Sequence, residues 1–185
     1  AFTGSPRTGA KLKGNKNLID TNCRVTLEAD SLNACVIGPD IDEDSDVWGT
    51  LCQNLVVDMT QKTGQKCTAV RKIVCPENLI EPLVEELKVR FEAITIGDPA
   101  SDDTRMGPVA SQSQFEDVMA GIQKLSEVSD VLLGGAERPT DKGFFVTPTL
   151  LKAKDVHANI LHSLEVFGPC ATILPYSGDA VEAID

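Results

Sequence analysis

Apolar and polar residues alternate with two different periods along the chain, and the change between the periods predicts a mixed α/β fold. In residues 47–59, the apolar side chains of Val47, Leu51 and Leu55 recur at helical spacing. Comparable patterns predict helices at 5–13, 78–91 and 111–125, and short apolar runs bounded by turn residues predict strands at 23–28, 34–37, 70–75, 131–133, 144–151 and 171–174. Because strands and helices alternate, we expect a layered α/β domain with a mostly parallel sheet and flanking helices.

Two polar signals indicate where helices begin. Ser111 is followed three residues later by Gln114, which is the spacing of a capping box. The acidic run at residues 40–46 precedes the helix at 47–59, and carboxylates are favoured at the positive end of a helix dipole. We therefore interpret this run as a solvated, helix-initiating segment rather than a metal site.

Composition excludes several classes of function. A chain of 185 residues is long enough for one hydrophobic core, and its formal charge of -11 argues against nucleic acid or an anionic membrane as partner. No apolar run approaches the roughly 18 residues of a membrane span, and the first residues lack a signal-peptide pattern. We expect a cytoplasmic protein with a solubilising acidic surface.

The six cysteines indicate reduced thiols rather than disulfides or a metal centre. They show no C-x-x-C spacing, and the two histidines, His157 and His162, are not at metal-binding spacing. We interpret both histidines as ordinary surface or boundary residues and predict no metal site.

One thiol occupies a distinctive place. Cys67 lies between the helix at 47–59 and the strand at 70–75, in a short loop where Gly64 can end the helix with a positive φ. The nearby cations Lys62, Lys66 and Arg71 would favour thiolate over thiol. An inert cysteine packed behind the helix is the alternative, and the loop by itself favours neither.

Neighbouring motifs favour the reactive thiol. The chain carries, in order, FTGS at residues 2–5, VTLEAD at 25–30, GQKC at 64–67 and EVFGP at 165–169, and two longer segments at 97–111 and 143–151 extend the pattern. These motifs resemble the aldehyde dehydrogenase superfamily nearly end to end. The resemblance implies an aldehyde dehydrogenase-like catalytic domain and an NAD(P)-dependent oxidation of an aldehyde to a carboxylic acid.

The resemblance implies a catalytic pair. Cys67 matches the nucleophile that forms a thioester with the substrate, and Glu28 matches the carboxylate that activates the hydrolytic water. Taken alone, Glu28 would be interpreted as an exposed carboxylate at a strand end. The other five thiols are predicted to serve packing: Cys23, Cys35, Cys52, Cys75 and Cys170.

The same resemblance implies a set of contacts to NAD or NADP. Gly4 and Ser5 match the loop on the cofactor side, where a helix N-terminus can meet a pyrophosphate. Glu165 matches the residue that holds the nicotinamide ribose hydroxyls, and Phe167 matches the residue that packs beside the ring.

The motif order also implies a domain organisation. Residues 1–22 match the tail end of a cofactor-binding domain, and residues 23–185 match a catalytic domain truncated at its C-terminal end. The chain begins without Met, and the family's remaining cofactor contacts would lie upstream. We therefore expect the isolated chain to fold without oxidising aldehydes, and the full-length protein to be a homo-oligomer.

One departure from the family pattern indicates a narrower class of substrates. Where most members have Leu-Glu-Leu-Gly-Gly-Lys, residues 27–32 read LEADSL. EADSLN together with MTQKTGQKCTA resembles a smaller group that acts on semialdehydes linked to coenzyme A, from ring cleavage of aromatic acids. In the phenylacetate branch the dehydrogenase is fused to a hotdog-fold hydratase, and in the benzoate branch it is unfused; both branches stay open.

Three other functions are possible from the sequence. A coenzyme A-acylating dehydrogenase would use Cys67 but pass the acyl group to a thiol, and the glutamate at position 28 favours water instead. A non-catalytic acidic domain is the second. A cysteine hydrolase is weaker, because neither histidine lies in a recognisable catalytic motif.

Overall fold

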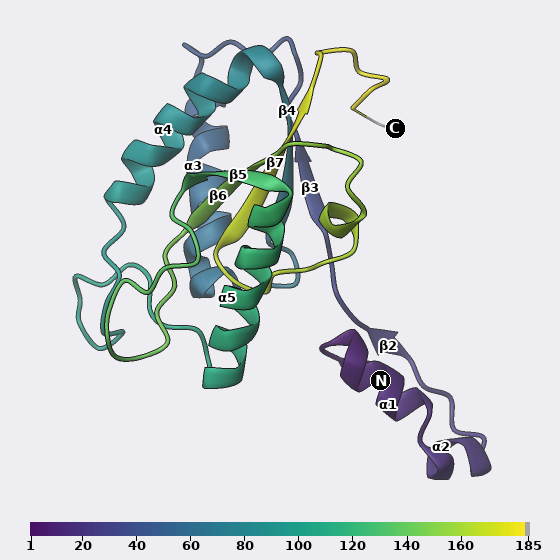
Figure 1. Ribbon diagram of the computed structural model, residues 1–185. Coiled ribbons are helices and arrows are strands. Elements are labelled where there is room, and N and C mark those ends of the chain that lie inside the picture. Colours follow the sequence, from purple (N-terminus) through teal and green to yellow (C-terminus); the bar gives the residue numbers. More distant parts are fainter. Residues whose placement is uncertain (184–185) are drawn as a thin grey trace. The chain divides into compact units, whose positions relative to one another are not determined.

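The computed structural model describes residues 1–183 and divides the chain into two compact units, Ala1–Ser31 and Leu32–Asp185. We call these unit 1 and unit 2. Figure 1 labels their helices and strands.

Unit 1 is a small helical segment beside a two-stranded sheet. Strand β1 (Phe2–Thr3) pairs in parallel with β2 (Leu27–Glu28), and helices α1 (Pro6–Lys13) and α2 (Lys16–Asp20) lie between them in sequence. Ser5 caps α1 by accepting a hydrogen bond from the backbone N–H of Thr8 at 3.3 Å, as expected for a serine before a helix. The helix predicted at 5–13 is thus confirmed.

The strand predicted at 23–28 is much shorter in the structure. The backbone N–H of Cys23 donates to the carbonyl of Leu18 at 2.9 Å, so it closes the turn after α2. Because β1 offers only two residues for pairing, the ladder is limited to Leu27–Glu28.

Unit 2 is built on a five-stranded sheet whose strands follow the order β3-β4-β7-β6-β5. Its strands are β3 (Asn33–Val36), β4 (Val70–Pro76), β7 (Cys170–Tyr176), β6 (Thr149–Ala153) and β5 (Ser129–Leu133). All neighbouring pairs are parallel except β5 with β6. The predicted, mostly parallel sheet is therefore confirmed, with one antiparallel edge strand.

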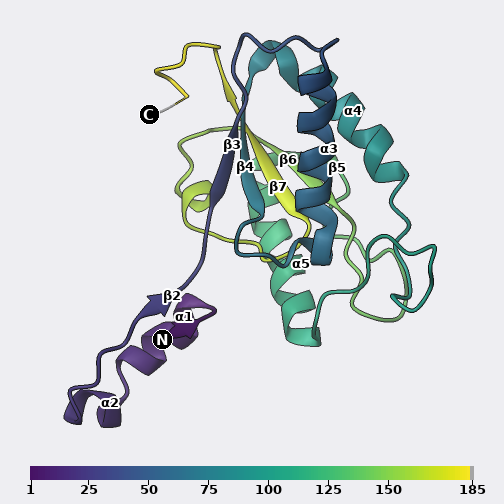
Figure 2. The same cartoon turned by 180° about the vertical axis from the view of Figure 1, so that it is seen from behind.

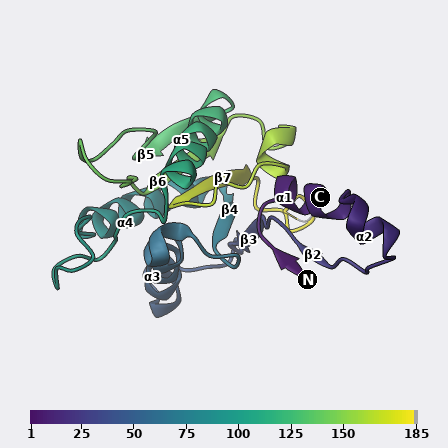
Figure 3. The same ribbon diagram turned by 90° about the horizontal axis from the view of Figure 1, so that it is seen from below.

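Helices cover both faces of this sheet, as strands buried on two sides require. Helices α3 (Asp46–Thr60) and α4 (Ile80–Glu92) lie on one face and α5 (Gln112–Glu127) lies on the other (Figure 3). Figure 2 shows α3 and α4 side by side from behind. Each face has its own buried apolar cluster, one including Leu55, Ile73 and Leu83, and the other including Val118, Ile122 and Leu151.

Short 3-10 turns complete unit 2 and explain small differences from the predicted boundaries. They are η1 (Gln61–Gly64), η2 (Glu77–Leu79) and η3 (Asn159–His162). The strand predicted at 144–151 begins only at Thr149, because the residue before it is Pro148, which has no N–H for a ladder. Both histidines are exposed, as predicted.

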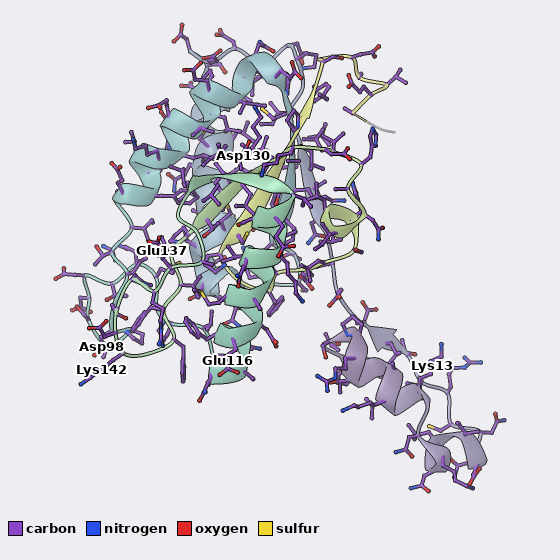
Figure 4. The ribbon with its side chains drawn as sticks, viewed as in Figure 1. Lys13, Asp98, Glu116, Asp130, Glu137 and Lys142 are labelled. Atoms are coloured by element: carbon purple, nitrogen blue, oxygen red, sulfur yellow. The ribbon has the colours of Figure 1, made fainter. Side chains whose placement is uncertain are left out.

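Several acidic side chains of unit 2 lie at its surface. Asp98, Glu116, Asp130 and Glu137 are exposed and project outward (Figure 4). Within residues 1–183 no cluster of three or more His, Cys, Asp or Glu side chains is arranged to hold a metal ion. Across the same residues, no helix has both the length and the apolar character needed to cross a membrane.

Candidate active site

The loop before Cys67 has an unusual backbone. Helix α3 ends at Thr60, and Lys62, Thr63 and Gly64 then adopt φ values of 53°, 56° and 69°. The positive φ predicted for Gly64 is confirmed, but the sequence did not reveal the other two. A β-branched residue rarely has a positive φ. Thr63 is held there by a hydrogen bond that its hydroxyl donates to the carbonyl of Gly107 at 3.0 Å.

Gly64 also brings the loop against the segment 165–169. A Cβ atom at position 64 would collide with the carbonyl group of Gly168 and would lie 2.7 Å from the nitrogen of Pro169. Only a residue without a side chain permits this approach between two backbones. The motifs GQKC and EVFGP, about a hundred residues apart in sequence, are therefore adjacent in unit 2.

Arg71 joins the same two segments through its guanidinium group. Its Nη2 donates to the carbonyls of Gly64 at 2.8 Å and Lys66 at 3.3 Å, and its Nη1 donates to the carbonyl of Gly168 at 2.7 Å. Its Nε lies 3.5 Å from Oε1 of Glu165, and both side chains are about 5% exposed. Burial lowers the pKa of Arg71, and the Glu165 carboxylate opposes that shift.

The two residues predicted to contact a cofactor in this segment both lie against the guanidinium of Arg71. Glu165 forms the ion pair just described. The ring centroid of Phe167 lies 5.6 Å from the guanidinium carbon, and Phe167 is 36% exposed. The segment thus presents a carboxylate and a partly open aromatic ring, held by one buried cation.

Lys66 and Asp58 form the opposite side of the Cys67 loop. The ammonium of Lys66 lies 2.5 Å from Asp58 Oδ1, and Asp58 Oδ2 accepts a hydrogen bond from the backbone N–H of Val70 at 2.5 Å. Two cations predicted to favour the thiolate, Lys66 and Arg71, are therefore each paired with a carboxylate. An open groove of about 490 Å³ runs beside this pair and is lined also by Gln61.

Asn33 and Gln65 hold the rest of the loop. The side-chain amide of Asn33, at the start of β3, donates to the carbonyls of Cys67 at 2.8 Å and Ala69 at 3.1 Å. Gln65 accepts from the backbone N–H of Ala110 at 2.9 Å and donates to the side chain of Gln114. Asn33 ends the EADSLN motif, and its side-chain amide fixes the backbone at the thiol.

The predicted capping box is present in part. Ser111 accepts a hydrogen bond from the backbone N–H of Gln114 at 3.3 Å, which confirms the cap of α5. The side chain of Gln114 accepts from Gln65, so this residue links α5 to the Cys67 loop.

The exposure of the thiols separates Cys67 from the thiols of the core. Cys67 is exposed, whereas burial raises the pKa of Cys52 to about 11 and the pKa values of Cys75 and Cys170 to about 12. The prediction that Cys23 serves packing is wrong. Cys23 is exposed, because it lies in the turn after α2 rather than in a strand.

The remaining predicted site residues lie in unit 1. Gly4 has a φ of 153°, and its backbone N–H donates to the carbonyl of Glu28 at 3.0 Å. A Cβ atom at position 4 would lie 2.8 Å from the ring of Phe2. Unit 1 therefore joins Gly4 to Glu28 through a backbone hydrogen bond, and in unit 2 Arg71 joins the loop that carries Cys67 to Glu165 and Phe167.

Sequence reasoning did not identify the structural role of Arg71. A signal was present, because Ile73 and Cys75 alternate with less buried positions along β4, and Arg71 falls on their buried side. An arginine at an inward position of a strand requires charged or hydrogen-bonding partners.

The chain is similar to proteins of known family and known structure. Residues 1–185 match the model of the aldehyde dehydrogenase family. The 3,4-dehydroadipyl-CoA semialdehyde dehydrogenase of Aromatoleum evansii is 35% identical over 184 residues, which are 96% of this chain and 36% of that protein. The chain thus spans just over a third of that relative's length.

Two crystal structures show the same fold. An aldehyde dehydrogenase from Bartonella henselae is 28% identical with a TM-score of 0.82, and the match covers 99% of this chain and 37% of that one. An aldehyde dehydrogenase C variant from Pseudomonas syringae, in complex with NAD+ and octanal, is 27% identical with a TM-score of 0.85, covering 98% and 36% of the two chains.

Proposed function

The chain belongs to the aldehyde dehydrogenase family, and from this premise we propose that its protein oxidises an aldehyde to a carboxylic acid with NAD or NADP as acceptor. One observation carries the proposal. The loop of the exposed Cys67 is fastened by Arg71 to the segment of Glu165 and Phe167. The loop that carries the nucleophile and a candidate cofactor-holding carboxylate are therefore joined through one buried cation.

The reaction begins at Cys67. Its thiolate forms a bond to the aldehyde carbon, and the carbonyl electron pair moves onto oxygen. When hydride then leaves that carbon, the C=O bond re-forms and a thioester remains on the sulfur. Glu28 accepts a proton from water as the water adds to the thioester, the C–S bond breaks, and the carboxylic acid leaves with the thiolate restored.

The side chains fit a nicotinamide cofactor. Glu165 would accept hydrogen bonds from ribose hydroxyls, and Phe167 offers a partly exposed ring beside it. Gly4 and Ser5 would form the cofactor-side loop, and Gly4 has no room for a side chain because Phe2 fills its Cβ position. When bound, the cofactor accepts the hydride. We propose accordingly that residues 1–22 belong to a cofactor-binding domain and residues 23–185 to the catalytic domain.

For the substrate we propose a semialdehyde linked to coenzyme A, from aromatic acid degradation. Support comes from the 35% identical relative and from Asn33, whose motif distinguishes this group and whose amide holds the Cys67 carbonyl. A coenzyme A-acylating dehydrogenase is the second candidate, and Glu28 favours water as the acyl acceptor. A homo-oligomer is part of the same proposal.

Glu28→Gln in the intact protein tests the mechanism. The amide keeps the shape of the side chain but cannot accept the proton, so one round of thiol attack and hydride loss still occurs. We expect a stoichiometric burst of reduced cofactor, followed by turnover slowed about a hundredfold or more. Mass spectrometry should find the acyl group on Cys67 during the stall.

Two variants serve as controls for this experiment. Cys67→Ser should abolish the burst, and Cys23→Ser, which removes the other exposed thiol, should leave it unchanged. Undiminished turnover in Glu28→Gln would remove Glu28 from the mechanism. A rate that depends on added free coenzyme A would move the protein to the acylating class.

A further inference from the structure

Arg71 is a buried cation in a strand position that normally carries an apolar side chain. Its side chain is 4% exposed, and its neighbours on the same side of β4, Ala69 and Ile73, are completely buried. Burying a charge is costly unless partners compensate it. An arginine here is therefore stabilised only by the groups that its guanidinium contacts.

Those groups come from two segments. Two carbonyls, of Gly64 and Lys66, belong to the loop that precedes Cys67, and the third, of Gly168, belongs to the segment 165–169. The planar fork of a guanidinium donates to several acceptors at fixed angles. A lysine ammonium at the same place would keep the charge but could not span the same acceptors.

The contact with Glu165 is of a different kind. Nε of Arg71 lies 3.5 Å from Oε1 of Glu165, a longer contact than the hydrogen bonds to the carbonyls of Gly168 and Gly64. The Glu165 carboxylate supplies the opposite charge for the guanidinium, while these carbonyls take its shortest hydrogen bonds. The same cation therefore sets the place of the carboxylate and the course of the Cys67 loop.

The two segments also touch directly. Gly64 packs against the backbone of Gly168 with no room for a side chain. A displacement of either segment would shift the acceptors of Arg71, and a change at Arg71 would release both segments.

We propose that Arg71 is a positioning residue that couples the reactivity of Cys67 to the placement of Glu165. The Glu165 half of this coupling rests on the proposed function, whereas the Cys67 half does not. Arg71 acts through the carbonyls of the loop and through the Glu165 carboxylate, so its loss should change thiol reactivity and cofactor affinity together.

Arg71→Lys in the intact protein tests the coupling, with Arg90→Lys as a matched control. Arg90 also forms an arginine–glutamate pair, with Glu86 at 2.6 Å, but on the partly exposed face of α4. We expect Arg71→Lys to slow alkylation of Cys67 by iodoacetamide and to raise the KM for NAD or NADP, each by about tenfold or more. Arg90→Lys should change neither quantity by more than about twofold.

A double-mutant cycle separates positioning from stability. Glu165→Gln alone should raise the cofactor KM and leave alkylation of Cys67 unchanged. In the Glu165→Gln background, Arg71→Lys should add little to KM but should slow alkylation as before. If Arg71 serves only stability, Arg71→Lys should lower kcat in proportion to the fraction of molecules that are folded. The KM and the alkylation rate per folded molecule would then be unchanged. That result would overturn the proposal.

Two further outcomes are decisive. If Arg71→Lys does not fold, Gly64→Ala separates the same two segments while keeping the guanidinium. We expect Gly64→Ala to change both the alkylation rate of Cys67 and the KM for NAD or NADP. Unchanged values of these two quantities would overturn the proposal. If the wild-type protein oxidises no aldehyde, the proposed function fails. The alkylation rates of the Arg71→Lys and Arg90→Lys variants then still support or refute the Cys67 half.

Discussion

Replacing Gly64 with alanine should destabilise unit 2 through a single methyl group. Gly64 has a φ of 69°, which costs a residue with a Cβ about 1–2 kcal/mol. The methyl would also collide with the backbone of Gly168, which cannot rotate away as a side chain would. Overpacking of this kind costs about 1–3 kcal/mol. We therefore expect the free energy of unfolding to fall by about 2–5 kcal/mol.

The measurement uses the only tryptophan of the chain. Trp48 is 6% exposed on α3, so its fluorescence reports unfolding of unit 2 in urea. Gly49→Ala is the matched control, because it lies inside α3 and a Cβ atom there meets nothing within 4 Å. That variant should be more stable than the wild type by about 0.5–1 kcal/mol.

Comparing the stabilities of Gly64→Ala and Gly49→Ala tests whether the collision with Gly168 causes the destabilisation. A Gly64→Ala protein within about 0.5 kcal/mol of wild type, the usual range for surface substitutions, would show that the two segments are not in the close contact described. Equal destabilisation by Gly49→Ala would show that the effect at position 64 does not depend on the collision.

Three further predictions can be checked on the 185-residue chain. In limiting iodoacetamide, read by peptide mass spectrometry, Cys67 should label first, with Cys23 the only comparable thiol; earlier labelling of a buried thiol would contradict this. Raised thiol pKa values stabilise the fold below about pH 8.5, and this contribution is lost as pH rises toward the value of about 12 for Cys75 and Cys170. Stability should thus fall above pH 8.5 by up to about 1.4 kcal/mol per pH unit for each such thiol, and Cys75→Ala should flatten the slope measured by urea unfolding. Calorimetric titration with NAD and NADP should give at most weak binding, and micromolar affinity would show that the domain assignment is misplaced.

Several local features followed from the sequence alone. The helix at 47–59, the serine cap at Ser111 and the positive φ of Gly64 were all predicted correctly. Each depends on hydrogen bonds or side-chain spacing within a few residues, so the local sequence contains the information. The family resemblance then identified Cys67, whose exposure in the loop agrees with the predicted role.

Other features depend on residues that are distant in the sequence. The positive φ of Thr63 relies on the hydrogen bond of its hydroxyl to the carbonyl of Gly107. The side chain of Gln114 accepts a hydrogen bond from Gln65 instead of completing the capping box of its own helix. No local pattern specifies such partners, because they become neighbours only when the sheet assembles. The shortened strand before Glu28 has a related cause, since its length is set by the two residues that β1 offers for pairing.

Arg71 shows most clearly which features follow from the sequence and which follow from the tertiary structure. By itself the sequence determined that a cation lies four residues after Cys67, within a predicted strand. Only the tertiary structure decided which groups compensate that cation, because Glu165 and Gly168 lie more than ninety residues away. Burial makes these partners obligatory, since a guanidinium removed from water must replace its hydration with protein acceptors.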